Sequence, residues 1–139
     1  MKIFGMTYGA ALIAFLILDS IWLGVIAKDF YAETLGFLMR ENIYWGAAAV
    51  FYALYLCGIV HFACLPAAKE GDLRKSVING ALFGFIAYGT YDLTNYATIR
   101  DWPLNVVVYD MLWGAFITGT TALAGFMMAH RLMEKEKAA

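Results

Sequence analysis

The sequence predicts an all-α integral membrane protein, a bundle of four transmembrane helices, and two observations support this prediction. Of the 139 residues, 63% are hydrophobic and only 15% are charged, whereas a soluble domain carries about 25% charged residues. Four windows are nearly free of charge, and each exceeds the roughly 20 residues that a helix needs to cross a bilayer. We expect helices at about 3–27, 43–67, 76–98 and 103–130, in a single transmembrane domain that covers residues 1–139.

Each boundary between these windows has a local signal. The first window exceeds the roughly 7–15-residue apolar core of a cleaved signal sequence and contains Asp19, so we expect a retained helix. The connection at 28–42 mixes charged and aromatic residues, which is typical of a short interfacial helix or of a simple amphipathic connector. Charged residues fill the second connection, at 69–75. Pro103 ends the third connection, at a position where proline opens a helix.

The loop charges predict the orientation of the chain. Seven Lys and Arg residues lie at the two termini and in the second connection, whereas three lie in the first and third connections. Because basic residues favour the cytoplasmic side, both termini are expected in the cytoplasm. The net charge of −1 offers no basic surface to a nucleic acid, so the lipid bilayer is the expected partner.

Three of the eleven acidic residues lie inside the apolar windows, namely Asp19, Asp92 and Asp110. An ionisable group inside a membrane is costly, so its default interpretation is functional. The first and third helices are expected to run outward and the fourth inward. At about 1.5 Å per residue, all three acids then lie about 8–12 Å below the outer surface, in one layer.

Each acid belongs to a stripe of residues at helical spacing, which predicts a position on the packed face of its helix. The three stripes are Gly5, Gly9, Leu12, Leu16, Asp19 and Leu23; Gly80, Gly84, Tyr88, Asp92 and Asn95; and Asp110, Gly114, Thr118, Thr121 and Gly125. The three carboxyl groups are therefore expected to face the interior of the bundle.

Three carboxylates in a medium of low polarity cannot all be ionised without a shared proton or a cation. No Lys or Arg lies within the spans, which leaves Lys28 and Arg100 at the outer rim, a cationic ligand or a divalent metal ion. No metal-ligating residue is assigned on this basis. Alternatively, the acids form no binding or catalytic site. One acid is then neutral and makes a hydrogen bond to a neighbouring helix, while another caps a helix or extends to the membrane interface.

Two tryptophans lie one helical turn from an acid, because Trp22 follows Asp19 and Trp113 follows Asp110 by three residues. At this depth their indole rings either pack or wall a pocket and bind a cation over their faces. Trp45 and Trp102 are expected in the aromatic belt at the membrane interface.

One face of the second helix is expected to carry Cys57, His61 and Cys64, which resembles a ligand array. The two sulfurs lie about 10.5 Å apart along the helix axis, too far for a disulfide. Because one helix face rarely encloses a metal ion, buried free cysteines and a hydrogen-bonded histidine are the better interpretation. A haem held by His61 and His130 is the less favoured alternative. No cofactor is otherwise implied.

Four segments together resemble a known family: LDSIWLG at 18–24, YDLTN at 91–95, DWP at 101–103 and DMLWG at 110–114. In this order they are similar to small four-helix bacterial inner-membrane proteins grouped as domain of unknown function 2177. The resemblance covers almost the whole chain. It implies a multi-pass protein of the bacterial inner membrane and no established activity.

The leading functional hypothesis is an outward-facing pocket that binds or transports a small cationic or amphiphilic ligand. Its expected lining is Asp19, Trp22, Asp92, Asn95, Asp110 and Trp113. Asp19 and Asp110 would carry ligand and proton, Asp92 with Asn95 would orient the ligand, and the indoles would form walls. The alternatives are a membrane-embedded enzyme acting on lipids near the outer leaflet, and a small subunit whose acids pair with an arginine of another membrane protein. Small residues on the second helix also offer a face for a homodimer.

Overall fold

A computed structural model describes residues 1–138, and in this part of the chain all regular structure is helical. The α-helices are α1 (Lys2–Ile21), α2 (Lys28–Leu35), α3 (Trp45–Ile59), α4 (Leu65–Glu70), α5 (Leu73–Thr98) and α6 (Leu104–Lys137). Two π-helical segments, Trp22–Ile26 and Val60–Cys64, extend α1 and join α3 to α4. The all-α prediction is confirmed.

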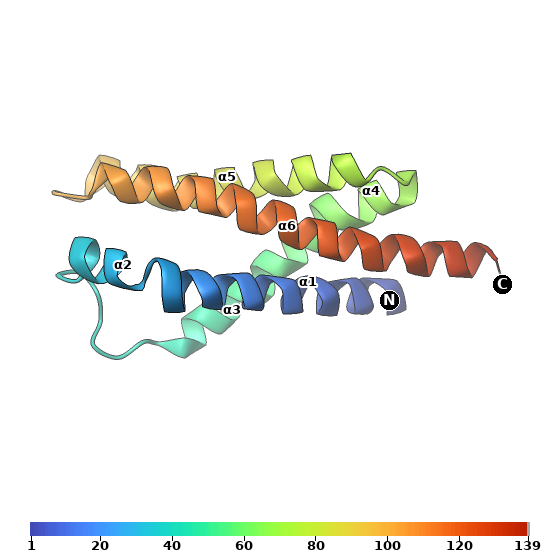
Figure 1. Cartoon of the computed structure of the whole chain (residues 1–139), viewed down its shortest axis with the longest axis horizontal. Helices are drawn as coiled ribbons and strands as arrows, with labels where there is room; N and C mark the ends of the chain where they lie inside the picture. The colour runs from blue at the N-terminus through green and yellow to red at the C-terminus, as the bar shows by residue number, and fades with distance from the viewer. Residues whose placement is uncertain (139) are drawn as a thin grey trace.

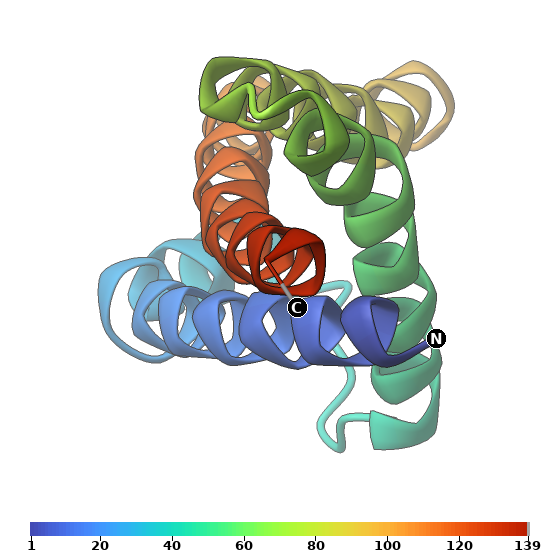
Figure 2. The same ribbon diagram turned by 90° about the vertical axis from the view of Figure 1, so that its right-hand side faces the viewer.

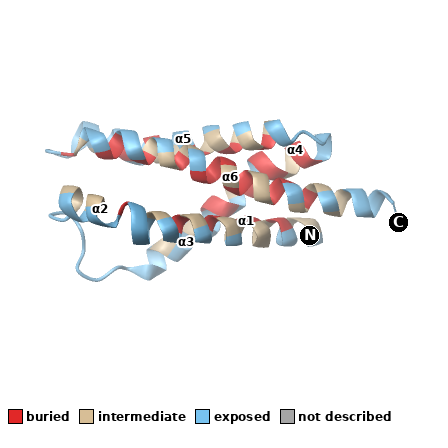
Figure 3. Cartoon of the chain, in the orientation of Figure 1, coloured by how far each residue is buried: buried red, intermediate tan, exposed pale blue. Residues whose placement is uncertain are grey.

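Three helical stretches are long and apolar enough to cross a membrane: Lys2–Ile26, Trp45–Glu70 and Leu104–Lys137. Helix α5 has 26 residues, about 39 Å of length, but it is more polar than the other three. Large apolar side chains such as those of Ile17, Leu54 and Leu112 are exposed. Exposed residues run along each of the long helices (Figure 3). Such extended apolar surface is suited to contact with lipid.

The long helices surround a common interior (Figures 1 and 2). Helix α6 lies alongside α5 on one side and α1 on the other, while α3 and α4 cross the bundle obliquely. Both termini and the α4–α5 turn lie at one end (Figure 1). Helix α2 and the α5–α6 turn lie at the opposite end.

Glycines allow α5 and α6 to pack closely together, as their stripes predicted. A Cβ added at Gly84 would overlap the carbonyl oxygen of Gly114, and one at Gly80 would lie 2.9 Å from the carbonyl oxygen of Thr118. Both glycines and the α6 stripe from Asp110 to Gly125 are buried. Such small residues let two helix backbones approach each other in a membrane.

The packed face of α1 differs from the prediction. Its buried residues are Thr7, Ala11, Phe15 and Asp19, whereas a Cβ at Gly5 or Gly9 would meet nothing within 4 Å. The prediction that the two glycines head the packed face is therefore wrong. The bulky Phe15 ring fills the space toward α3, where it lies edge-on to two tyrosine rings at 5.5 and 5.9 Å. Close backbone contact is not needed on this side.

The π-helical segment Val60–Cys64 also changes the expected face of the second span. A π-helix has more residues per turn than an α-helix, so the positions that follow it rotate around the axis. Cys64 is buried, and its Sγ donates to the carbonyl oxygen of Ala122 at 3.6 Å. Cys57 and His61 are exposed. The prediction of two buried cysteines on one face with His61 is therefore wrong.

The helix ends follow from local signals. Gly71, with φ of +71°, ends α4. The side chain of Asp72 then accepts a hydrogen bond of 2.9 Å from the backbone N–H of Lys75. This cap starts α5 at Leu73, before the expected residue 76. Helix α6 begins directly after Pro103, as expected, but continues to Lys137, beyond residue 130.

The packing of α5 against α6 gives the first testable prediction. Gly84→Ala is expected to lower the free energy of unfolding by about 1–3 kcal/mol, because the added methyl group meets Gly114 and Thr118. Gly5→Ala is the matched control and is expected to leave stability unchanged or slightly raised, since its methyl group meets nothing. Unfolding in detergent micelles measures both variants. Equal stabilities of the two would contradict this packing.

A candidate ligand pocket beneath helix α2

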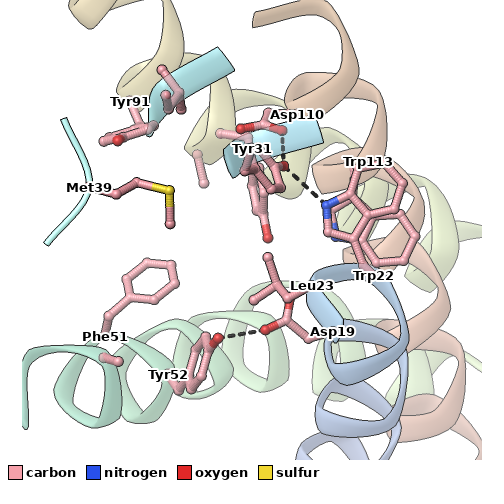
Figure 4. Close-up of a pocket in the computed structure, with 14 residues that line it drawn as sticks. Asp19, Trp22, Leu23, Tyr31, Met39, Phe51, Tyr52, Tyr91, Asp110 and Trp113 are labelled. Carbon is pink, nitrogen blue, oxygen red and sulfur yellow. Dashed lines mark hydrogen bonds between the residues drawn. The ribbon is translucent and has the colours of Figure 1, made fainter. Parts of the chain in front are cut away.

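A pocket of about 590 Å³ opens where α2 covers the end of the bundle (Figure 4). Fourteen residues from α1, the π-helical segment Trp22–Ile26, α2, α3, α5, α6 and the loop after α2 line it. Seven of them are aromatic: Trp22, Tyr31, Phe51, Tyr52, Tyr88, Tyr91 and Trp113. Five others are apolar, and the remaining two are Asp19 and Asp110. The pocket thus combines aromatic walls with two carboxyl groups.

Each of the two pocket carboxyl groups accepts a hydrogen bond from a tyrosine of another helix. Tyr52 of α3 donates to Oδ2 of Asp19 at 2.5 Å, and Tyr31 of α2 donates to Oδ1 of Asp110. Asp19 is 7% exposed and Asp110 is 8% exposed. Both carboxyl groups are therefore largely buried, but each retains an edge that faces the cavity.

Tyr31 connects α2 to the bundle. The indole Nε1 of Trp22 donates to the Tyr31 hydroxyl at 3.1 Å, and this hydroxyl in turn donates to Asp110. Phe30 adds an edge-on contact with Tyr109 at 5.4 Å. Burial, together with the hydrogen bond to Asp110, holds the pKa of Tyr31 well above its usual value of 10.0. The phenol therefore stays protonated and acts as a donor throughout the physiological pH range.

The two predicted indole walls lie against each other. The rings of Trp22 and Trp113 stack with centroids 4.3 Å apart and planes inclined by 7° (Figure 4). The Nε1 of Trp113 is buried and has no hydrogen-bond partner within residues 1–138. Trp102 is also buried, at 6% exposure, and packs edge-on against Tyr91. The indole of Trp102 is therefore enclosed by the protein, whereas that of Trp45 is exposed. The place of both residues in the aromatic belt stays a prediction.

The structure brings together four of the six predicted site residues and leaves two outside the lining. Asp19, Trp22, Asp110 and Trp113 line the pocket, and Asp92 and Asn95 do not. Asp92 is fully buried in α5, and neither of its carboxyl oxygens has a partner in the described part of the chain. Lys28 and Arg100, the predicted rim cations, are exposed and also lie outside the lining.

The candidate metal and haem ligands are placed as follows. Within residues 1–138, no group of three or more His, Cys, Asp or Glu side chains is arranged to hold a metal ion. His130 stacks on Phe126, and its Nδ1 lies 3.3 Å from the carbonyl oxygen of Ala68. His61 is exposed and lies edge-on to Phe62.

The two tyrosines that donate to the pocket acids, Tyr31 and Tyr52, were not predicted from the sequence. Tyr88 was expected on the interior stripe of its helix but not in the pocket. A usable signal was present, because a carboxyl group inside an apolar bundle needs a donor from the protein itself. The spans predicted from the sequence contain no Lys or Arg, and the chain has nine tyrosines. The sequence therefore indicated tyrosine hydroxyls as hydrogen-bond donors to Asp19 and Asp110, although not which tyrosines.

The long apolar helices and their exposed apolar side chains define a helical membrane protein. The chain belongs to the family described as predicted membrane protein (DUF2177), whose sequence profile matches residues 4–127. The match includes every residue that lines the pocket. No curated protein and no solved structure matches the chain significantly.

The hydrogen bonds of Tyr31 give the second prediction. Tyr31→Phe keeps the ring but removes the hydroxyl shared by Trp22 and Asp110. We expect the docking of α2 to weaken by about 1–3 kcal/mol, because a buried carboxyl group loses its donor. Hydrogen exchange of the backbone amides at 28–35 is then expected to accelerate. Tyr44→Phe, at an exposed tyrosine, is the matched control. Unchanged exchange in Tyr31→Phe would show that this bond does not hold α2.

Proposed function

We propose that the chain crosses the membrane four times with both termini in the cytoplasm, and that its pocket faces the outer side and binds a small organic cation. Helix α5 is the fourth span in this proposal. Its length and its close packing along α6 support this assignment, because two of its polar residues, Ser76 and Asp92, are buried in the bundle. The hydroxyls of the exposed residues Thr90, Thr94 and Thr98 donate to backbone carbonyl oxygens of their own helix. The basic residues of the termini and of the 69–75 connection support the orientation.

The observation that carries the binding proposal is the composition of the pocket wall. Among the described residues, Asp19 and Asp110 are the only Asp, Glu, Lys, Arg or His side chains in the lining, and half of the lining is aromatic. The faces of aromatic rings attract cations, most strongly where water is excluded. Carboxylates supply the matching negative charge. A cavity of about 590 Å³ lies within the roughly 300–1,000 Å³ range of small-molecule sites.

The same arrangement couples the ligand to protons. A cation binds the ionised form of a carboxyl group, so a cation and a proton compete for Asp19 and Asp110. Affinity for a permanent cation is therefore expected to fall as the pH is lowered through the titration of these acids. Alternating exposure of the pocket would turn such competition into exchange of the cation for protons across the membrane.

Reporter fusions test the proposed topology. Alkaline phosphatase fused after Glu41 is expected to be active, because this connection lies outside the cytoplasm. Green fluorescent protein fused after Lys137 is expected to fluoresce, because the C-terminus lies inside. The opposite pattern at either position would overturn the orientation.

Tryptophan fluorescence tests the binding, since Trp22 and Trp113 line the pocket. We expect saturable quenching by an alkyltrimethylammonium ion and about tenfold or more weaker binding of its neutral tert-butyl analogue. Asp19→Asn is expected to weaken binding of the cation and reduce its pH dependence. Glu33→Gln, which removes an exposed carboxylate from α2, is the matched control. Equal binding of the cation and its neutral analogue would contradict the proposal.

A further inference from the structure

We infer that the ligand of this pocket carries two cationic centres joined by an apolar spacer, one for Asp19 and one for Asp110. Its chemical class is an α,ω-diamine or a related bis-ammonium compound. The inference rests on the proposed function, because it specifies the ligand class of the same pocket.

The two pocket carboxyl groups form separate anionic positions. Asp19 belongs to α1 and accepts a hydrogen bond from Tyr52 of α3. Asp110 belongs to α6 and accepts a hydrogen bond from Tyr31 of α2. Figure 4 shows the two pairs at different parts of the cavity. Each tyrosine bonds only one oxygen of its partner, Oδ2 of Asp19 and Oδ1 of Asp110. The second oxygen of each carboxyl group can therefore accept a hydrogen bond from one of the two ammonium groups of the ligand.

Charge balance favours two cationic centres over one. The lining contains no Lys, Arg or His among the described residues, so the protein supplies no internal counter-charge to either acid. A ligand with a single charge would leave the other carboxyl group either protonated or unpaired, and an unpaired charge at such a buried position is costly. A dication compensates both carboxylates of the lining at once, whereas the third buried acid, Asp92, lies outside the lining.

The wall between the two positions suits an apolar spacer. Leu23 lies beside Asp19 (Figure 4), and Trp22 and Tyr88 also line the cavity. Methylene groups placed against these side chains are removed from water, which stabilises the complex. The volume of about 590 Å³ accommodates both head groups together with the chain that joins them.

Matched amines test this inference on the full chain in lipid nanodiscs. Fluorescence titrations compare α,ω-diaminoalkanes of increasing spacer length with the primary monoamines of equal length. The expected result is one optimal spacer length, at which the diamine binds about 30-fold or more tightly than its monoamine. Asp19→Asn and Asp110→Asn are each expected to reduce the diamine to the affinity of the monoamine, whereas Glu33→Gln retains the full difference.

The outcomes separate the two proposals. If the diamine and the monoamine bind the wild-type chain equally well at every length, the inference of two cationic centres is overturned and cation binding stands. If neither amine binds, both proposals fail. The comparison of spacer lengths uses only the wild-type chain, so it decides the question even where an Asp→Asn variant does not fold.

Discussion

Inside an apolar bundle, each polar side chain has to find its partner within the protein, and this constraint joins the helices around the pocket. Tyr52 and Asp19 join α3 to α1, while Tyr31 and Asp110 join α2 to α6. The two carboxyl groups therefore connect pairs of helices and also border the cavity. Because each group has both positions at once, the contacts between the helices and the lining of the cavity depend on the same side chains.

The glycine contact between α5 and α6 determines the shape of the wall. A Cβ at Gly114 would overlap the ring of Tyr88, so the absence of a side chain there lets this ring lie against α6. Asp110 and Trp113 occupy the adjoining turn of α6, on the side that faces the cavity. The missing side chain at Gly114 thus makes room for the Tyr88 ring, and Asp110 lies one helical turn before Gly114 on α6.

Much of this arrangement could be predicted from the sequence. Small residues spaced four apart on α5 and α6 indicate close contact between two helices. Their stripes correctly predicted that Gly84 and Asp110 are buried in the bundle. The same pattern failed at Gly5, because the neighbouring face of α1 offered Phe15, whose ring fills a wider gap. The donor Tyr31 was not predicted, because it comes from a short helix in a connection whose docking depends on tertiary contacts.

The most direct test of this account is the spatial pairing of tyrosine with aspartate in a lipid bilayer. Solid-state NMR of chains labelled at the tyrosine ring Cζ and the aspartate Cγ measures it. The account predicts two cross-peaks, one of which disappears in Tyr52→Phe and the other in Tyr31→Phe. Absence of both cross-peaks in the wild-type chain, or their persistence in these variants, would contradict the claim that paired tyrosines hold the pocket acids.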